Sequence, residues 1–270
     1  MSSIIIIQQT DAVHLISDGA GYDNEGVVQR VASKIHSLPL ANCIYASRGC
    51  TWTEDALAVM MACYSSFDEI ATELPDFLLR LKSAAVAAGV AVIDRTFIVT
   101  VAGWSDALQK WAAVVYSSWD KCDPHDVDGL SFIEGYETCR PILASTICCA
   151  PPVEELALGR PVESQSEVDA IDPVQDGITL IEVQRARPLL ISEAHARYVV
   201  GGFAELGSVS AAGIDRRVIK EWPDKIGAHI LPEGLLQMSD LEALSVQWSA
   251  ELAASREQEI AAPLCRHMVG

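Results

Sequence analysis

Basic side chains are scarce in this sequence of 270 residues, where 19 lysines and arginines stand against 37 aspartates and glutamates, a formal net charge of −18. An acidic surface repels phosphate backbones, so we expect no nucleic-acid partner. Half of the residues are hydrophobic, yet the longest apolar runs, such as Ile4–Ile7 and Ala84–Ile93, are far shorter than a membrane span. The start, Met-Ser-Ser, has no basic region of the kind that opens a signal peptide. We therefore expect no membrane partner and a cytoplasmic location.

Motifs for redox, metal and nucleotide chemistry are also missing. The eight cysteines form no Cys-x-x-Cys pair, which predicts reduced thiols that pack as small hydrophobic side chains. A disulfide or a metal site is the alternative, and Cys148-Cys149 is the first pair to check. No glycine-rich loop of the phosphate-binding kind joins a strand to a helix, so we expect no cofactor.

One segment has the donor types that a divalent metal prefers. It contains Asp120, Cys122, Asp123, His125, Asp126 and Asp128. A polar turn between two strands has the same composition, and we expect the turn and no metal.

The first third of the chain shows short strands followed by two helices. Its β-rich runs predict four strands in antiparallel hairpins, at Ile4–Gln9, Ala12–Ser17, Val31–His36 and Asn42–Ser47. A glycine-rich loop separates the second strand from the third. Helical spacing of apolar residues predicts one helix over Ala56–Tyr64 and another from a cap at Ser66 to Gly89, with Pro75 dividing the second.

The rest of the chain returns to strands and ends in a helix. Strands are expected at Thr96–Ala102, Ala112–Ser118, Leu130–Ile133 and Ile178–Gln184, and in a hairpin of His195–Phe203 with Ser208–Ile214. One or two short helices are expected between Glu154 and Ala170, and an amphipathic helix over Asp240–Glu259. This order is typical of α+β proteins in which helices cover packed sheets.

Three residues of the first third are evenly spaced. Ser2, Asp18 and Lys34 follow one another at intervals of sixteen residues, with Asp18 inside HLISDGAGYD and Lys34 at the start of SKIHSLPLANCIYASRGC. In this spacing, and in the two helices that follow, the sequence resembles the N-terminal nucleophile hydrolases, most closely the proteasome β-subunit. The resemblance implies a single domain over residues 1–270, a four-layer α/β/β/α sandwich of two antiparallel sheets flanked by helices, with a C-terminal helix and tail over residues 235–270. It also implies a homo-oligomer or a larger assembly.

The resemblance further implies a catalytic site at Ser2, Asp18, Lys34 and Gly49. Removal of Met1 would leave Ser2 as the nucleophile, and its α-amine, with an ordinary pKa near 8, as the base. Lys34 would favour the alkoxide as a nearby cation and Asp18 would hold Lys34, while backbone N–H groups near Gly49 would stabilise the oxyanion. The implied substrate is a peptide or a small amide.

Each of the three evenly spaced residues also has an ordinary structural role that the sequence leaves open, and two other functions stay open as well. Ser2 is also typical of an ordinary surface position, Asp18 before a glycine is typical of a turn, and Lys34 is typical of a solvated strand end. A non-catalytic assembly protein on the same scaffold, such as a phage virion component, is the second functional hypothesis. A ligand-binding module that uses the cleft of the old site is the third.

Overall fold

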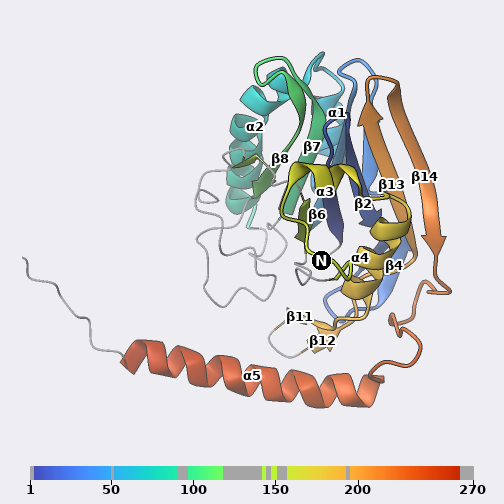
Figure 1. The fold of residues 1–270 in the computed structure, drawn as a ribbon. Helices are drawn as coiled ribbons and strands as arrows, with labels where there is room; N and C mark the ends of the chain where they lie inside the picture. The colour runs from blue at the N-terminus through green and yellow to red at the C-terminus, as the bar shows by residue number, and fades with distance from the viewer. Residues whose placement is uncertain are drawn as a thin grey trace, which may run out of the picture.

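A computed structural model describes residues 3–49, 52–89, 97–117, 142–143, 147–150, 157–192 and 195–261. Within these residues the chain is an α+β protein with two five-stranded antiparallel sheets and helices packed against them (Figure 1). The predicted strand at 130–133 and the donor-rich segment at 120–128 lie outside the described residues.

The first sheet holds the start of the chain near its centre. Its strand order is β10 (Ile147–Ala150), β1 (Ile4–Gln8), β2 (Ala12–Asp18), β13 (Phe203–Ser210) and β14 (Gly213–Glu221). β1 contains four successive isoleucines and is buried along its whole length. A strand covered on both faces is apolar throughout rather than alternating, which explains this run.

The second sheet has the order β5 (Ile35–Leu38), β6 (Cys43–Gly49), β7 (Phe97–Ser105), β8 (Lys110–Ser117) and β9 (Ile142–Leu143). Two small ribbons, β3 (Ala20–Tyr22) with β4 (Val28–Val31) and β11 (Leu189–Ser192) with β12 (His195–Arg197), complete the strands of the described residues. The helices are α1 (Trp52–Met61), α2 (Phe67–Ala87), α3 (Gln165–Asp169), α4 (Gln175–Arg185) and α5 (Met238–Ala261).

Alternate residues of β1 face different neighbours. Ile4 and Ile6 belong to a cluster that includes Ile44 of β6 and Ile98 of β7, so the two sheets pack against each other. Ile5 and Ile7 belong to a second cluster with residues of α4 such as Leu180. Successive side chains of a strand point to opposite faces, so β1 joins the contact between the sheets to the contact with α4.

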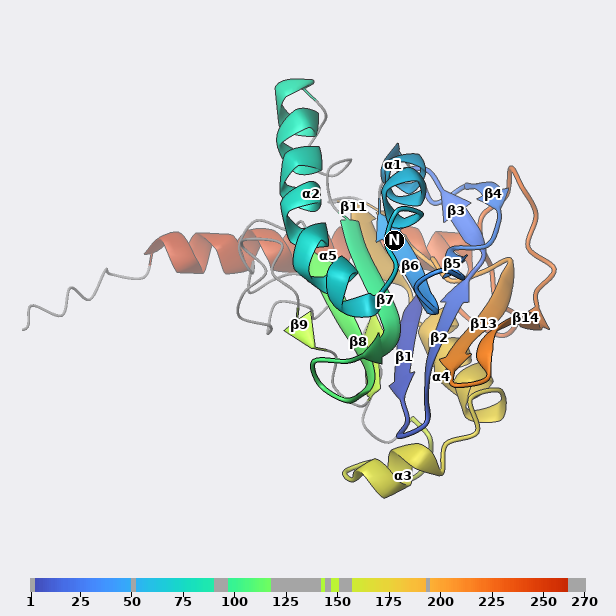
Figure 2. The ribbon, with the colours of Figure 1, turned by 90° about the horizontal axis from the view of Figure 1, so that it is seen from above.

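The second sheet is covered on its other face by α1 and α2. Leu57 of α1 and Leu74 and Leu78 of α2 share a cluster with Tyr45 and Val99. Viewed from above, α2 and α4 lie on opposite sides of the strands (Figure 2). Among the described residues, no helix is long and apolar enough to cross a membrane.

Several expected elements are confirmed with small shifts in their ends. The hairpin of β1 and β2 forms, and Ser66 caps α2 by accepting a hydrogen bond from the backbone N–H of Glu69. Gly89 follows the end of α2 with a φ of 73°, the left-handed conformation that glycine favours. Pro75 does not divide α2, which continues through it as one helix.

The segment that was expected as a strand over Ile178–Gln184 is a helix, so that prediction is wrong. In α4 the buried residues Gly177, Leu180, Ile181 and Gln184 recur at intervals of three and four. This helical period places one stripe of the segment against the first sheet, and it outweighs the β-branched residues that suggested a strand. The carboxylate of Asp172 accepts hydrogen bonds from backbone N–H groups at the start of α4.

Candidate active site

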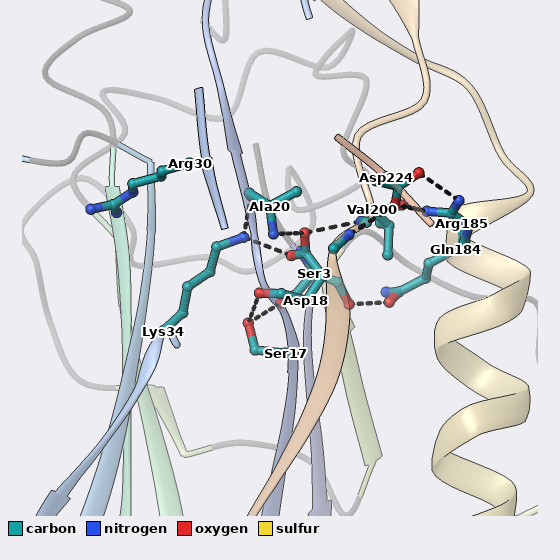
Figure 3. A network of polar contacts seen from close by, with 12 residues as sticks. Ser3, Ser17, Asp18, Ala20, Arg30, Lys34, Gln184, Arg185, Val200 and Asp224 are labelled. Atoms are coloured by element: carbon teal, nitrogen blue, oxygen red, sulfur yellow. Dashed lines mark hydrogen bonds and ion pairs between the residues drawn. The ribbon is translucent and has the colours of Figure 1, made fainter. Parts of the chain in front are cut away.

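The sequence-predicted residues Asp18 and Lys34 form a buried ion pair. Lys34 Nζ lies 2.8 Å from Asp18 Oδ1, and the two side chains are 5% and 0% exposed. Asp18 ends β2, and Lys34 lies between β4 and β5, directly before Ile35 (Figure 3). The expected strand Val31–His36 is thus interrupted, and the interruption leaves Lys34 free of sheet pairing so that its side chain reaches the end of β2.

Asp18 is surrounded by hydrogen-bond donors. Its Oδ1 accepts from the backbone N–H of Ser3 at 2.8 Å as well as from Lys34. Its Oδ2 accepts from the backbone N–H groups of Ala20 and Gly201, each at 3.2 Å. Charge-assisted bonds to a carboxylate are stronger than neutral ones, so these four donors fix the carboxylate beside the start of β1.

Lys34 is held by two acceptors. Besides Asp18, its Nζ donates to the carbonyl oxygen of Ala20 at 2.6 Å. Burial lowers the pKa of Lys34, and the negative charge of Asp18 partly opposes that shift. An ammonium has three N–H donors, and two are accounted for by these contacts, so one donor is left for an acceptor beyond the described interactions. A buried cation in this position can stabilise negative charge on an oxygen that forms next to it.

Ser2, the predicted nucleophile, lies outside the described residues, but Ser3 shows how the start of β1 is anchored. Ser3 is fully buried, and its carbonyl oxygen accepts a hydrogen bond from the hydroxyl of Ser17 at 2.8 Å. Its own hydroxyl donates to Oε1 of Gln184 on α4. Together with the bond from its N–H to Asp18, these contacts hold Ser3 through its N–H, its carbonyl and its side chain.

A second buried ion pair adjoins the first through two glycines. Arg185 of α4 binds Asp224 through both guanidinium nitrogens, at 2.8 and 2.9 Å, and donates to the carbonyl oxygen of Val200 at 2.7 Å. The backbone N–H of Gly202 donates to Asp224 at 2.8 Å, while that of Gly201 donates to Asp18. The two pairs therefore hold neighbouring peptide groups of one short segment (Figure 3).

Neither glycine of this segment can carry a side chain without rearrangement. A Cβ on Gly201 would lie 2.5 Å from Oδ2 of Asp224. Gly202 has a φ of 76°, and a Cβ there would lie 2.8 Å from Cγ1 of Val31. Close approach of the backbone to its neighbours is thus the reason for glycine at both positions.

Gly49, the predicted oxyanion residue, is not joined to the ion pair by any interaction of the described residues. It is the exposed last residue of β6, pairs with Phe97 of β7 and has a φ of 108°. A positive φ of this size favours glycine.

Sequence reasoning missed Ser3, Ser17, Gln184 and the backbone of Gly201. Gln184 was assigned to a strand, and the helical spacing of Gly177, Leu180 and Gln184 is the signal that would have placed it on a buried helical face. The pair Gly201-Gly202 is visible in the sequence, but only the fold brings Gly201 to Asp18, which lies 183 residues away in sequence.

The described residues offer no metal centre and few reactive thiols. They contain no group of three or more His, Cys, Asp or Glu side chains that could hold a metal ion. Of the cysteines described, Cys43 and Cys63 are free, and burial raises the pKa of the Cys43 thiol to about 12. Cys43 therefore stays a neutral thiol at physiological pH and packs as a small hydrophobic side chain.

A cavity of about 520 Å³ lies at the other end of the strands. Its lining includes Trp104 and Ala211. Ala211 follows the end of β13 that pairs with Ala12, whereas Asp18 pairs with Ala204 at the opposite end. The cavity is therefore separate from the Asp18–Lys34 pair.

Comparison with known proteins does not assign the chain to a family. No protein-family model matches it, and no curated protein matches it.

Proposed function

We propose that this protein is a serine-type N-terminal nucleophile hydrolase that cleaves peptide or small amide bonds. The observation that carries the proposal is the buried Asp18–Lys34 pair, in which the same carboxylate oxygen also accepts the N–H of Ser3. Ser2 directly precedes Ser3 in the chain, so the proposed nucleophile is attached one residue before the N–H that Asp18 holds.

The proposal includes the four-layer α/β/β/α sandwich of that family. Its support is the pair of sheets that share one cluster of apolar side chains, with α1 and α2 against one sheet and α4 against the other. The hairpin of β1 and β2 in the centre of its sheet, and the hairpin of β5 and β6 before two helices, follow the order that the resemblance implies.

The reaction begins once the bond between Met1 and Ser2 is cut. The freed α-amine of Ser2 takes the proton of the Ser2 hydroxyl, directly or through a water, while Lys34 stabilises the developing alkoxide. The oxygen attacks the amide carbon, the C–N bond breaks, and the leaving amine receives the proton that the α-amine had taken. Water then hydrolyses the ester, releasing a carboxylic acid and restoring Ser2. Asp18 positions Lys34 throughout, and backbone N–H groups near Gly49 donate to the oxyanion.

The first experiment is the intact mass of the protein purified from its native source. A mass lower by one methionine is expected, because the mechanism needs the free amine of Ser2. The purified protein is then treated with a serine-directed fluorophosphonate probe, alongside the variants Ser2→Ala, Lys34→Ala and Lys225→Ala. Wild type and Lys225→Ala, which removes an exposed lysine, should be labelled.

The Ser2→Ala variant should not be labelled, and Lys34→Ala should be labelled about 100-fold more slowly or not at all. Circular dichroism of each variant separates a lost site from a lost fold. Retained or acetylated Met1, together with no labelling of the wild type, would reject the enzyme and leave the assembly protein on an inherited scaffold as the better hypothesis.

A further inference from the structure

Arg197, the last residue of β12, is a buried arginine with almost no partners. The residue is 6% exposed. Its Nη1 donates to the backbone carbonyl of its neighbour Ala196 at 2.7 Å, and its Nε is buried without a hydrogen bond. Among the ion pairs within the described part of the chain, none involves Arg197.

Arg185 of the same protein is a buried arginine whose charge is balanced by a carboxylate, and it serves as the comparison for Arg197. Arg185 is as deeply buried, and it is paired in a bidentate geometry with Asp224 and stacked over the ring of Trp222. Arginine stays protonated in proteins, so Arg197 cannot relieve the cost of burial by losing its charge. A buried charge is ordinarily paired, because moving it out of water costs several kcal/mol. Within the described part of the chain, Arg197 therefore has no anionic partner of the kind that Asp224 provides for Arg185.

The fold puts Arg197 on the side of its ribbon that faces the first sheet. Arg197 is directly opposite Leu189 in the pairing of β11 with β12, and opposite residues point to the same face. Leu189 packs in the cluster that contains Ile5 of β1, whereas Tyr198, on the other face, packs with Leu241 of α5.

Arg197 is also close in sequence to Gly201, which contacts the Asp18–Lys34 pair. Gly201, four residues further on, donates its N–H to Asp18. Four residues of chain span at most about 14 Å, so the Cα of Arg197 lies within that distance of Gly201. A substrate of several residues that is bound at the Asp18–Lys34 pair is long enough to span this distance.

We propose that Arg197 forms an anion-binding site for a carboxylate group, and that this carboxylate belongs to the substrate. The guanidinium matches a carboxylate in a planar, bidentate geometry, and the orphan Nε supplies one of its two donors. The second part of this inference rests on the proposed function, because it takes the neighbouring ion pair to be the hydrolytic site. The substrate class is accordingly an acidic peptide or an amide with a free carboxylate.

Anion binding is tested without any need for catalysis. The wild type, Arg197→Met and Arg217→Met are titrated calorimetrically with glutarate, with sulfate and with chloride at equal ionic strength. Arg217 is the matched control, because its side chain is 58% exposed. Wild type and Arg217→Met should bind glutarate, and Arg197→Met should bind it at least tenfold more weakly. Stability is measured by thermal unfolding in chloride. The unfolding midpoint of Arg197→Met should equal or exceed that of the wild type, because an apolar side chain replaces an uncompensated buried charge.

Each outcome decides a separate part of the inference. Equal glutarate binding by Arg197→Met and wild type, or no binding by either, overturns the anion site. Binding of sulfate without binding of glutarate keeps an anion site but overturns the assignment of a carboxylate as its ligand.

The substrate assignment is then tested with a pair of acylated peptide coumarin amides that differ at one position, which is Glu in one peptide and Gln in the other. Wild type should cleave the Glu member with a kcat/KM about tenfold higher, and Arg197→Met should lose that preference. Cleavage without a preference rejects the substrate assignment, whereas glutarate binding without cleavage of either peptide rejects the hydrolase and leaves the anion site standing.

Discussion

At the scale of single residues, the candidate site depends on one buried ion pair that is expensive to break. Removing either partner of such a pair leaves a buried charge uncompensated and typically costs 3–5 kcal/mol, although replacing both by apolar residues is often neutral. Stability alone therefore does not explain why Asp18 and Lys34 are both present. Their contacts with Ser3 and Ala20 tie the pair to the start of β1, where the proposed nucleophile is attached.

The pKa of Lys34 leads to a prediction about pH. Burial lowers this pKa below its ordinary value of 10.5, with Asp18 opposing the shift. The mechanism needs the Ser2 amine neutral and Lys34 protonated. We expect kcat/KM to rise with pH through the pKa of the amine, near 8, and to fall again at a pH below 10.5 as Lys34 loses its proton.

The check is a pH–rate profile of the wild type and of Lys34→Arg on a coumarin amide substrate. Arginine keeps its charge, so the alkaline decline should disappear in any Lys34→Arg activity that remains. An unchanged alkaline decline in that variant would show that another group causes it.

At the scale of elements, side-chain hydrogen bonds reinforce the pairing of strands. His14 of β2 bridges Ser208 of β13, at 2.8 Å from Nδ1, and Gln9 after β1, at 2.9 Å from Nε2. The amide nitrogen of Gln9 donates in turn to the carbonyl oxygens of Val168 in α3 and of Ile171 shortly after α3. Because the Gln9 oxygen can only accept, Nε2 of His14 carries a proton, and in the neutral imidazole Nδ1 accepts from the hydroxyl of Ser208.

His14 should make the protein less stable in acid. Burial lowers the pKa of His14 below 6.5, while Asp11 opposes the shift. The unfolded chain then binds more protons than the folded chain between the two pKa values, so the free energy of unfolding falls as pH drops from 6.5 toward the folded pKa. His36 has its pKa lowered in the same direction, so the wild type carries two such groups.

Urea denaturation at pH 7.5 and pH 5.5 tests this for wild type and His14→Gln. The glutamine variant should lose less stability between the two pH values than the wild type. An equal loss in both proteins would mean that His14 does not titrate across this range.

At the scale of the whole molecule, the two sheets approach closely enough that a single methyl group matters. Gly207 lies in β13, and a Cβ there would be 2.7 Å from Cγ2 of Ile35 in the other sheet and 3.4 Å from Cδ1 of Ile44. Overpacking a core by one methyl group typically costs 1–3 kcal/mol because its neighbours must shift.

Gly207→Ala should therefore lower the free energy of unfolding by about 1–3 kcal/mol, measured by chemical denaturation. The double variant Gly207→Ala with Ile35→Ala should lose less than the sum of the two single losses, because removal of the Ile35 side chain makes room for the methyl group. Strict additivity would indicate that the sheets do not meet at this point.

The residues of the fold that could be predicted from sequence were those with strong local signals. Ser66 at a cap, Gly89 after a helix and the isoleucines of β1 follow local rules of capping and β-propensity. The strand expected over Ile178–Gln184 was wrong because short apolar runs fit both periods, and burial against the first sheet decides between them.

The sequence by itself determined the spacing of Asp18 and Lys34 and the α+β order of elements, because spacing and periodicity are local properties of the chain. Only the tertiary structure decided what surrounds these two residues: the N–H of Gly201, which donates to Asp18, and the side chain of Gln184, which accepts from the neighbouring Ser3. The physical reason is that these contacts join residues far apart in sequence. They form only after the sheets and α4 have packed, and no local propensity encodes them.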